Sequence, residues 1–192
     1  MEPTMENPIC IAVTGPESTG KSALSKQLAE ALPGAVVVPE YARSYLESLP
    51  RKYTAADVEY IARRQLALER KMLSAKPRVL VCDTDLLVIR VWMEFVFGHC
   101  PRWIVNASAG RQYHLSLLTD IDLPWEADPL REHPDQRKVL FDLYQHHLKA
   151  LGRNFKVIRG SGHTRLENAL SAVNSSPMLS GLNTISPTFA VS

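Results

Sequence analysis

The stretch Gly15-Pro16-Glu17-Ser18-Thr19-Gly20-Lys21-Ser22 satisfies the phosphate-binding loop pattern G-x-x-x-x-G-K-[ST] in full. An apolar run over residues 9–13 precedes it, and leucines recur at helical spacing over residues 24–32. In such a strand–loop–helix unit, backbone N–H groups and the positive end of the helix face one anion. Lys21 then reaches the β- and γ-phosphates, and the Ser22 hydroxyl ligates Mg²⁺. These residues predict a site for a nucleoside triphosphate and Mg²⁺, rather than a glycine turn that only joins a strand to a helix.

The composition is that of an ordinary globular domain, with 192 residues, 45% of them hydrophobic, and a net charge of +2. The basic side chains form no block, so we expect no nucleic-acid partner. The N-terminus has no signal pattern and no apolar run approaches a membrane span, so we expect no membrane contact and a cytoplasmic protein. Cys10, Cys82 and Cys100 lack metal-ligand spacing, and two of them fall in expected strands, which favours a reducing compartment.

Short apolar segments alternate with helical ones along the chain, which predicts an α/β fold of the P-loop NTPase type. The sheet is expected to be doubly wound, mainly parallel and five-stranded, with its ligand crevice at the carboxyl ends of the strands. Thr54, with an acid three residues later, predicts the start of one helix, and Gly152 predicts the end of another. The expected strands cover residues 9–14, 35–38, 79–82, 115–118 and 155–158.

We expect a single kinase-sized domain over residues 9–174, preceded by a short extension over residues 1–8. Residues 175–192 are rich in Ser, Pro, Thr and Asn and have no periodicity, which predicts a disordered or loosely attached tail. The apolar residues of this tail leave a docking role open. The sequence also leaves open whether the chain forms a homo-oligomer.

Three acids and one arginine follow expected strands and are candidates for chemistry. Asp83 ends a buried strand, where P-loop proteins hold Mg²⁺, and Asp85 is expected to cap the helix over residues 86–97 or to contact substrate. Glu40 follows the second strand and could accept the proton of an attacking hydroxyl, while Arg43 could steady the transferred phosphoryl group. The alternative is that Glu40 and Arg43 form an ordinary surface pair.

The segment over residues 119–131 is too rich in Pro and Asp for a regular element, and it runs on to Arg137. A long polar loop at this place predicts a lid. Arg131 and Arg137 could neutralise phosphate charge when the lid closes, or could be solvated. Trp125 could stack on a flat heterocycle or could anchor the core. Trp92 and Trp103 lie on helical stretches and are expected in the core. Gln65 is either a reader of an amide or base edge, or a solvated helix residue.

Four motifs in this order resemble the nicotinamide riboside kinase domain of the NadR type, and together they span most of residues 9–173. They are Gly-Pro-Glu-Ser-Thr-Gly-Lys-Ser at 15–22, Pro-Glu-Tyr-Ala-Arg at 39–43, Cys-Asp-Thr-Asp at 82–85 and Leu-Leu-Thr-Asp-Ile-Asp-Leu-Pro-Trp-Glu-Ala-Asp-Pro-Leu-Arg at 117–131.

The resemblance implies ATP-dependent phosphorylation of the 5′-hydroxyl of nicotinamide riboside, which gives nicotinamide mononucleotide for NAD salvage. NadR-type proteins often carry an N-terminal adenylyltransferase domain, and here we expect that activity to be absent. Carried over by position, the resemblance assigns the ATP phosphates and Mg²⁺ to Lys21 and Ser22, the nucleoside and metal side to Glu40, Tyr41, Arg43 and Asp83, and the substrate and lid segment to Trp125, Asp128 and Arg131.

Two other functions fit the same residues. A kinase for another nucleoside or nucleotide would share the loop and the lid, because selectivity resides in a few pocket side chains. An ATP-binding module without turnover would share the loop alone. A GTPase switch is disfavoured, because the sequence has no guanine-reading Asn-Lys-x-Asp segment.

Overall fold

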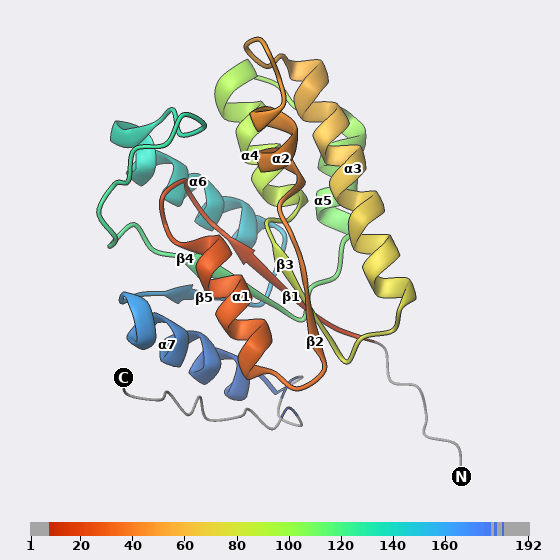
Figure 1. Cartoon of the computed structure of the whole chain (residues 1–192), viewed down its shortest axis with the longest axis vertical. Helices are drawn as coiled ribbons and strands as arrows, with labels where there is room; N and C mark the ends of the chain where they lie inside the picture. Colours follow the sequence, from red (N-terminus) through yellow and green to blue (C-terminus); the bar gives the residue numbers. More distant parts are fainter. Residues whose placement is uncertain (1–7, 178, 180–181, 183–192) are drawn as a thin grey trace.

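The computed structural model describes residues 8–177, 179 and 182, and its centre is a parallel five-stranded sheet in the order β2-β3-β1-β4-β5 (Figure 1). The strands are β1 (Ile9–Thr14), β2 (Ala35–Val38), β3 (Val79–Asp83), β4 (Leu115–Thr119) and β5 (Phe155–Ile158). The helices are α1 (Lys21–Ala31), α2 (Tyr41–Glu47), α3 (Ala55–Ser74), α4 (Leu86–Phe97), α5 (Arg102–Gly110), α6 (Arg137–Ala150) and α7 (Gly162–Asn174), with a short 3-10 helix, η1, at Pro134–Gln136.

The side chains of β1 alternate between two apolar layers, which is why this central strand is apolar throughout. Ile11 and Val13 join a core cluster with leucines of α1 and α7. Cys10 and Ala12 point to the opposite face and join a cluster that α3 covers. Helices therefore cover both faces of the sheet, and the expected doubly wound P-loop fold is confirmed.

The order of the strands explains where a ligand can bind. β1 pairs with β3 on one side and with β4 on the other, so Val13 lies beside Asp83 and Thr14 beside Leu118. The phosphate-loop motif therefore leaves the sheet between two strand ends that carry polar residues. This edge is the crevice that the strand pattern predicts.

Most element boundaries agree with the sequence-based expectations. β3 and β4 each continue one residue further than expected, through Asp83 and Thr119. α3 begins after Thr54 with a capping box that Asp57 completes, as the acid three residues on predicts. Gly152 follows α6 in the left-handed region, with φ of 61°, where a side chain would be strained.

The chain beyond α7 differs from the expected loose tail at two positions. Leu179 and Leu182 are buried in the core cluster with side chains of α1 and α7. Burial of these apolar side chains is favourable because it removes their surface from water. The folded unit thus extends past the expected boundary at residue 174. Residues 178, 180, 181 and 183–192 of the predicted tail, and residues 1–7 of the N-terminal extension, lie outside the described residues.

Among the residues that the structure describes, no helix combines the length and the hydropathy needed to cross a bilayer. Cys10 and Cys82 are buried free thiols, as their positions in strands predict.

Candidate functional site

The phosphate-loop motif is held rigidly against the end of β4. Gly15 has φ of 140°, and a Cβ at this position would lie 2.5 Å from Thr119 Oγ1, so only glycine fits. The hydroxyls of Thr19 and Thr119 lie 2.7 Å apart, and Thr19 also donates to the carbonyl of Pro16 at 2.8 Å. These contacts fix the curve of the loop before any ligand arrives.

Lys21 and Ser22 are the first two residues of α1, which begins where this loop ends. Lys21 Nζ donates to the carbonyl of Pro16 at 2.7 Å, and the Ser22 side chain is exposed. Burial lowers the pKa of Lys21, whereas the carboxylates of Glu40 and Asp83 oppose that shift. The ammonium group therefore sits in an enclosed place among acids, where a phosphate would give it a stronger partner than a carbonyl does.

Glu40 and Asp83 approach this lysine from two different strand ends. Burial raises the pKa of Glu40, Lys21 opposes the shift, and Asp83 adds to it. Asp83 is 5% exposed, and its Oδ1 has no hydrogen-bond partner among the described residues. A buried carboxylate oxygen without a partner is costly unless a ligand satisfies it.

These residues fit a magnesium ion bound together with phosphates. Within the described part of the chain, no three or more His, Cys, Asp or Glu side chains gather as a metal cage. Mg²⁺ seldom uses such a cage, because it is usually bound through one or two carboxylates, water and substrate phosphates. The exposed Ser22 hydroxyl and the unpartnered Asp83 oxygen supply that limited set of ligands.

Gln65 has a role that neither sequence-based interpretation gave it. Its side chain is only 1% exposed, so it is not a solvated helix residue. Its Oε1 accepts from the Tyr41 backbone N–H at 2.9 Å, and its Nε2 donates to the Pro39 carbonyl at 3.3 Å. Both amide groups are therefore used by the backbone on either side of Glu40, and α3 thereby positions that carboxylate.

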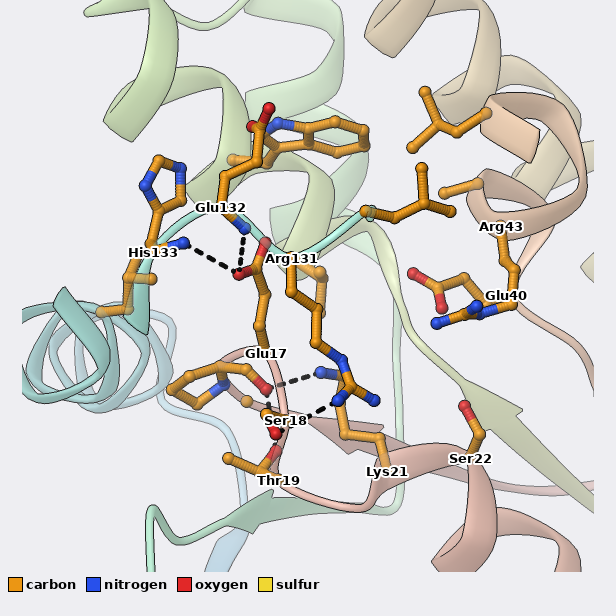
Figure 2. A pocket seen from close by; sticks show the side chains of 18 of the residues that line it. Glu17, Ser18, Thr19, Lys21, Ser22, Glu40, Arg43, Arg131, Glu132 and His133 are labelled. Atoms are coloured by element: carbon orange, nitrogen blue, oxygen red, sulfur yellow. Dashed lines mark hydrogen bonds between the residues drawn. The ribbon is translucent and has the colours of Figure 1, made fainter. Parts of the chain in front are cut away.

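The predicted lid contacts Glu17 and Ser18 of the phosphate loop, two positions that the loop motif leaves unspecified (Figure 2). Glu17 Oε2 accepts from the backbone N–H groups of Glu132 and His133 at 3.0 and 3.3 Å. Ser18 Oγ accepts from the backbone N–H of Glu126 at 2.9 Å. The loop thus binds the lid with the same residues that shape the phosphate cradle.

Two lid arginines are placed as the sequence predicts, near the loop. Arg131 Nη1 donates to the carbonyl of Glu126 at 2.6 Å and to Ser18 Oγ at 3.3 Å, and Arg131 lines the cavity. Arg137 donates to the carbonyls of Leu123 and Ser18 at 2.9 and 3.1 Å. To reach a phosphate, Arg131 would have to leave its contacts with Glu126 and Ser18, whereas Arg137 joins the base of the lid to the loop.

One cavity of about 860 Å³ joins the phosphate loop to a chamber under the lid. The loop residues from Gly15 to Ser22 line one end, and Glu40 and Arg43 lie on the wall between the two ends (Figure 2). The chamber has a mixed lining, in which Arg51, Lys52 and Glu132 lie beside apolar side chains from α2, α4, the lid and α6. The apolar side chains include Leu46, Val88, Val91, Trp92, Phe95, Leu130 and Leu140.

Other predicted site residues lie outside the cavity wall. The Tyr41 ring packs near Tyr45 and Tyr60, with centroids 6.3 Å away in each case. Asp128 accepts from Arg43 Nη2 at 3.0 Å and thus acts on the site through that arginine. Trp125 is half-buried and does not line the cavity, whereas its neighbours Pro124 and Glu126 do.

Asp85 differs from both of its sequence-based interpretations. It occupies the position before α4, but its carboxylate makes no capping hydrogen bond and does not reach the cavity. It is fully buried and pairs with Arg153 Nη1 at 2.6 Å. Trp103 packs in the expected apolar cluster, whereas Trp92 belongs to that cluster and also lines the cavity.

Residues 10–165 match a family described as AAA domain, and this match covers well over half of the chain. The chain belongs to the AAA domain family. No curated protein matches the sequence.

The fold also resembles solved structures of small-molecule kinases. A NadR protein in complex with NR has a TM-score of 0.78 at 20% identity, with 96% of this chain and 55% of that chain covered. A NadR protein in complex with NAD and AMP-PNP has a TM-score of 0.71 at 22% identity, with 90% and 50% covered. This chain therefore spans about half the length of those proteins, and the resemblance to NadR-type domains is confirmed at the level of the fold.

A thymidylate kinase from Ehrlichia chaffeensis shares the fold over nearly its whole length. Its TM-score is 0.62 at 12% identity, with 86% of this chain and 98% of that chain covered. A deoxyadenosine kinase from M. mycoides with bound dATP has a TM-score of 0.57 at 16% identity, with 87% and 100% covered. The same scaffold thus occurs in proteins named for different acceptors.

The contacts of Glu17 predict that it controls how often the lid opens. The bond between Arg131 and Glu132 is a trypsin site, and Glu17 holds the N–H of that bond. Because Glu17→Ala removes two hydrogen bonds to a carboxylate, we expect cleavage after Arg131 to become roughly ten-fold faster. Cleavage is followed by mass spectrometry under native conditions.

Glu30→Ala is the matched control, because Glu30 is an exposed acid of α1 that does not line the cavity. It should leave the cleavage rate at the wild-type value. Equal rates for Glu17→Ala and wild type would show that this carboxylate does not hold the lid.

Proposed function

We propose that this chain is an ATP-dependent kinase that phosphorylates the 5′-hydroxyl of nicotinamide riboside to give nicotinamide mononucleotide. The observation that carries the proposal is the single cavity that runs from the phosphate loop past Glu40 to the apolar chamber. A phosphate donor at one end and a nucleoside at the other would meet beside that carboxylate. Phosphoryl transfer depends mainly on such positioning and on charge stabilisation.

The proposal gives five residues a role in this reaction, and four of them line the cavity. Glu40 accepts the proton of the attacking 5′-hydroxyl. The hydroxyl oxygen forms the new bond to the γ-phosphorus while the bond from that phosphorus to ADP breaks. Lys21 and Arg131 stabilise the charge that develops on the transferred group. Ser22 and Asp83 would hold Mg²⁺, which would offset the charge of the β- and γ-phosphates.

Two observations support nicotinamide riboside as the acceptor. The four motifs occur in the order of the NadR-type kinase domain, and the fold is similar to that of a NadR protein in complex with NR. At the acceptor end, two of the three basic residues that line the cavity, which are Arg43, Arg51 and Lys52, are already paired with carboxylates. Arg43 is paired with Asp128, and Arg51 with Asp57, so a nucleotide's phosphate would have to displace these carboxylates.

The direct test is ADP release by the purified protein with ATP and Mg²⁺. The rate of ADP release without an acceptor is compared with the rates in the presence of nicotinamide riboside, of each of a panel of common nucleosides, and of thymidylate. We expect release that depends on nicotinamide riboside, with formation of the mononucleotide. Lys21→Ala should lower kcat by about 100-fold or more, because it removes a buried charge contact with the phosphates.

The other outcomes contradict the proposal in distinct ways. Release with another nucleoside or with thymidylate would keep a kinase and change its acceptor. Tight ATP binding without acceptor-dependent release would replace the enzyme by a binding module.

The proposed base and the loop lysine predict a bell-shaped pH profile of kcat/KM. Burial raises the pKa of Glu40 above 4.5, so the rate should rise with pH through that raised value as the carboxylate ionises. Burial lowers the pKa of Lys21 below 10.5, so the rate should fall at high pH as the ammonium group loses its proton.

Glu40→Gln tests the acid limb of this profile. It should lower kcat by about 100- to 10,000-fold and abolish the rise at low pH. If the variant keeps the acid limb, Glu40 is not the base, and Asp83 becomes the residue to test.

A further inference from the structure

A chain of three side chains closes the acceptor end of the cavity. Tyr53, from the loop between α2 and α3, donates a hydrogen bond to Glu132 Oε2 of the lid. Trp92 of α4 donates its indole N–H to the Tyr53 hydroxyl at 3.2 Å, and the two rings meet edge to face with centroids 5.0 Å apart. All three residues line the cavity, so the bridge joins lid, loop and helix around the space for the acceptor.

The Glu132 carboxylate has no cation to balance its charge. Among the described residues, no basic side chain lies within ion-pair distance of it, and its one side-chain partner is the phenol of Tyr53. Burial and the hydrogen bond to Glu132 raise the pKa of Tyr53 to about 12, so this partner is neutral at pH 7. Glu132 is exposed, so water also reaches this carboxylate, and its described side-chain partner at the edge of the chamber is a neutral donor.

None of the basic residues that line the cavity pairs with Glu132 in the described part of the chain. Arg43 pairs with Asp128, Arg51 with Asp57 and Arg131 with Glu126. Lys21 faces the phosphate end. Lys52 lines the cavity from the loop beside Tyr53, and its exposed side chain can remain in water.

Aromatic rings complete the chemistry of this end. Trp92 and Phe95 line the chamber from one helix, and both are half-buried. A flat ring gains from burial against such side chains whether or not it is charged. A positively charged ring gains in addition from the negative faces of the aromatic rings and from the unbalanced carboxylate.

We propose that this chamber selects an acceptor whose ring carries a positive charge, and that Glu132, held by Tyr53, is the residue that sets this preference. The inference rests on the proposed function, because it concerns the base of the nucleoside that the kinase phosphorylates. Nicotinamide riboside has such a ring, a pyridinium. Its 1,4-dihydro form has nearly the same size and the same carboxamide, but its ring is uncharged.

The experiment compares these two nucleosides with wild-type protein, Glu132→Gln and Glu30→Gln. Binding is measured by calorimetry with AMP-PNP and Mg²⁺ present, and kcat/KM is measured with ATP. We expect the wild type to prefer the cationic ring, and Glu132→Gln to lower that preference roughly ten-fold. Glu30→Gln removes the same charge from exposed α1, and it should keep the wild-type preference.

A second pair of variants separates charge from shape. Glu132→Asp keeps the charge on a shorter side chain and should retain part of the preference. Tyr53→Phe keeps the ring but frees the carboxylate, so it should weaken the preference less than Glu132→Gln does. Equal weakening of both nucleosides by Glu132→Gln, or no preference in the wild type, would overturn the inference.

The binding and turnover measurements separate this inference from the proposed function. A charge preference in binding that Glu132→Gln abolishes supports the inference even if neither nucleoside is phosphorylated, and that lack of turnover would overturn the kinase assignment alone. Turnover of both nucleosides without a charge preference would support the kinase and overturn the inference. If neither nucleoside binds, both are wrong.

Discussion

The close approach of Gly15 to Thr119 is the contact on which the rest of the site depends. A Cβ at Gly15 would lie 2.5 Å from the threonine hydroxyl oxygen, so the loop can lie against β4 only because that atom is missing. The contact sets the path of the loop, and Lys21 follows at the first turn of α1. A phosphate site of this kind requires no ordering when its ligand arrives, and this preorganisation favours tight binding.

The same loop also organises the acceptor side, through side chains that the phosphate pattern leaves variable. Glu17 and Ser18 accept hydrogen bonds from the lid backbone, so the lid is positioned by the donor site itself. α3 contributes Gln65, which holds the backbone on both sides of Glu40. The phosphate loop, Glu40 and the lid are therefore placed by elements that meet at one edge of the sheet, where parallel strands end.

Local patterns predicted the fold well, because strand and helix periodicity and the loop motif act over a few residues. The contacts across the site were out of reach of such patterns. Gln65 and Glu40 lie on different elements, and so do Glu132 and Tyr53, which only the folded chain brings together. Trp92 illustrates the limit, since its helical spacing predicts a core residue and the structure adds a place in the cavity wall.

The most direct measurement is a crystal structure of the protein with AMP-PNP, Mg²⁺ and nicotinamide riboside. The account predicts the γ-phosphate at Lys21, the ion between the phosphates, Ser22 and Asp83, and the 5′-hydroxyl within hydrogen-bond distance of Glu40. The pyridinium ring should lie in the chamber beside Trp92. A nucleoside bound outside this cavity, or a hydroxyl turned away from Glu40 and the γ-phosphate, would contradict it.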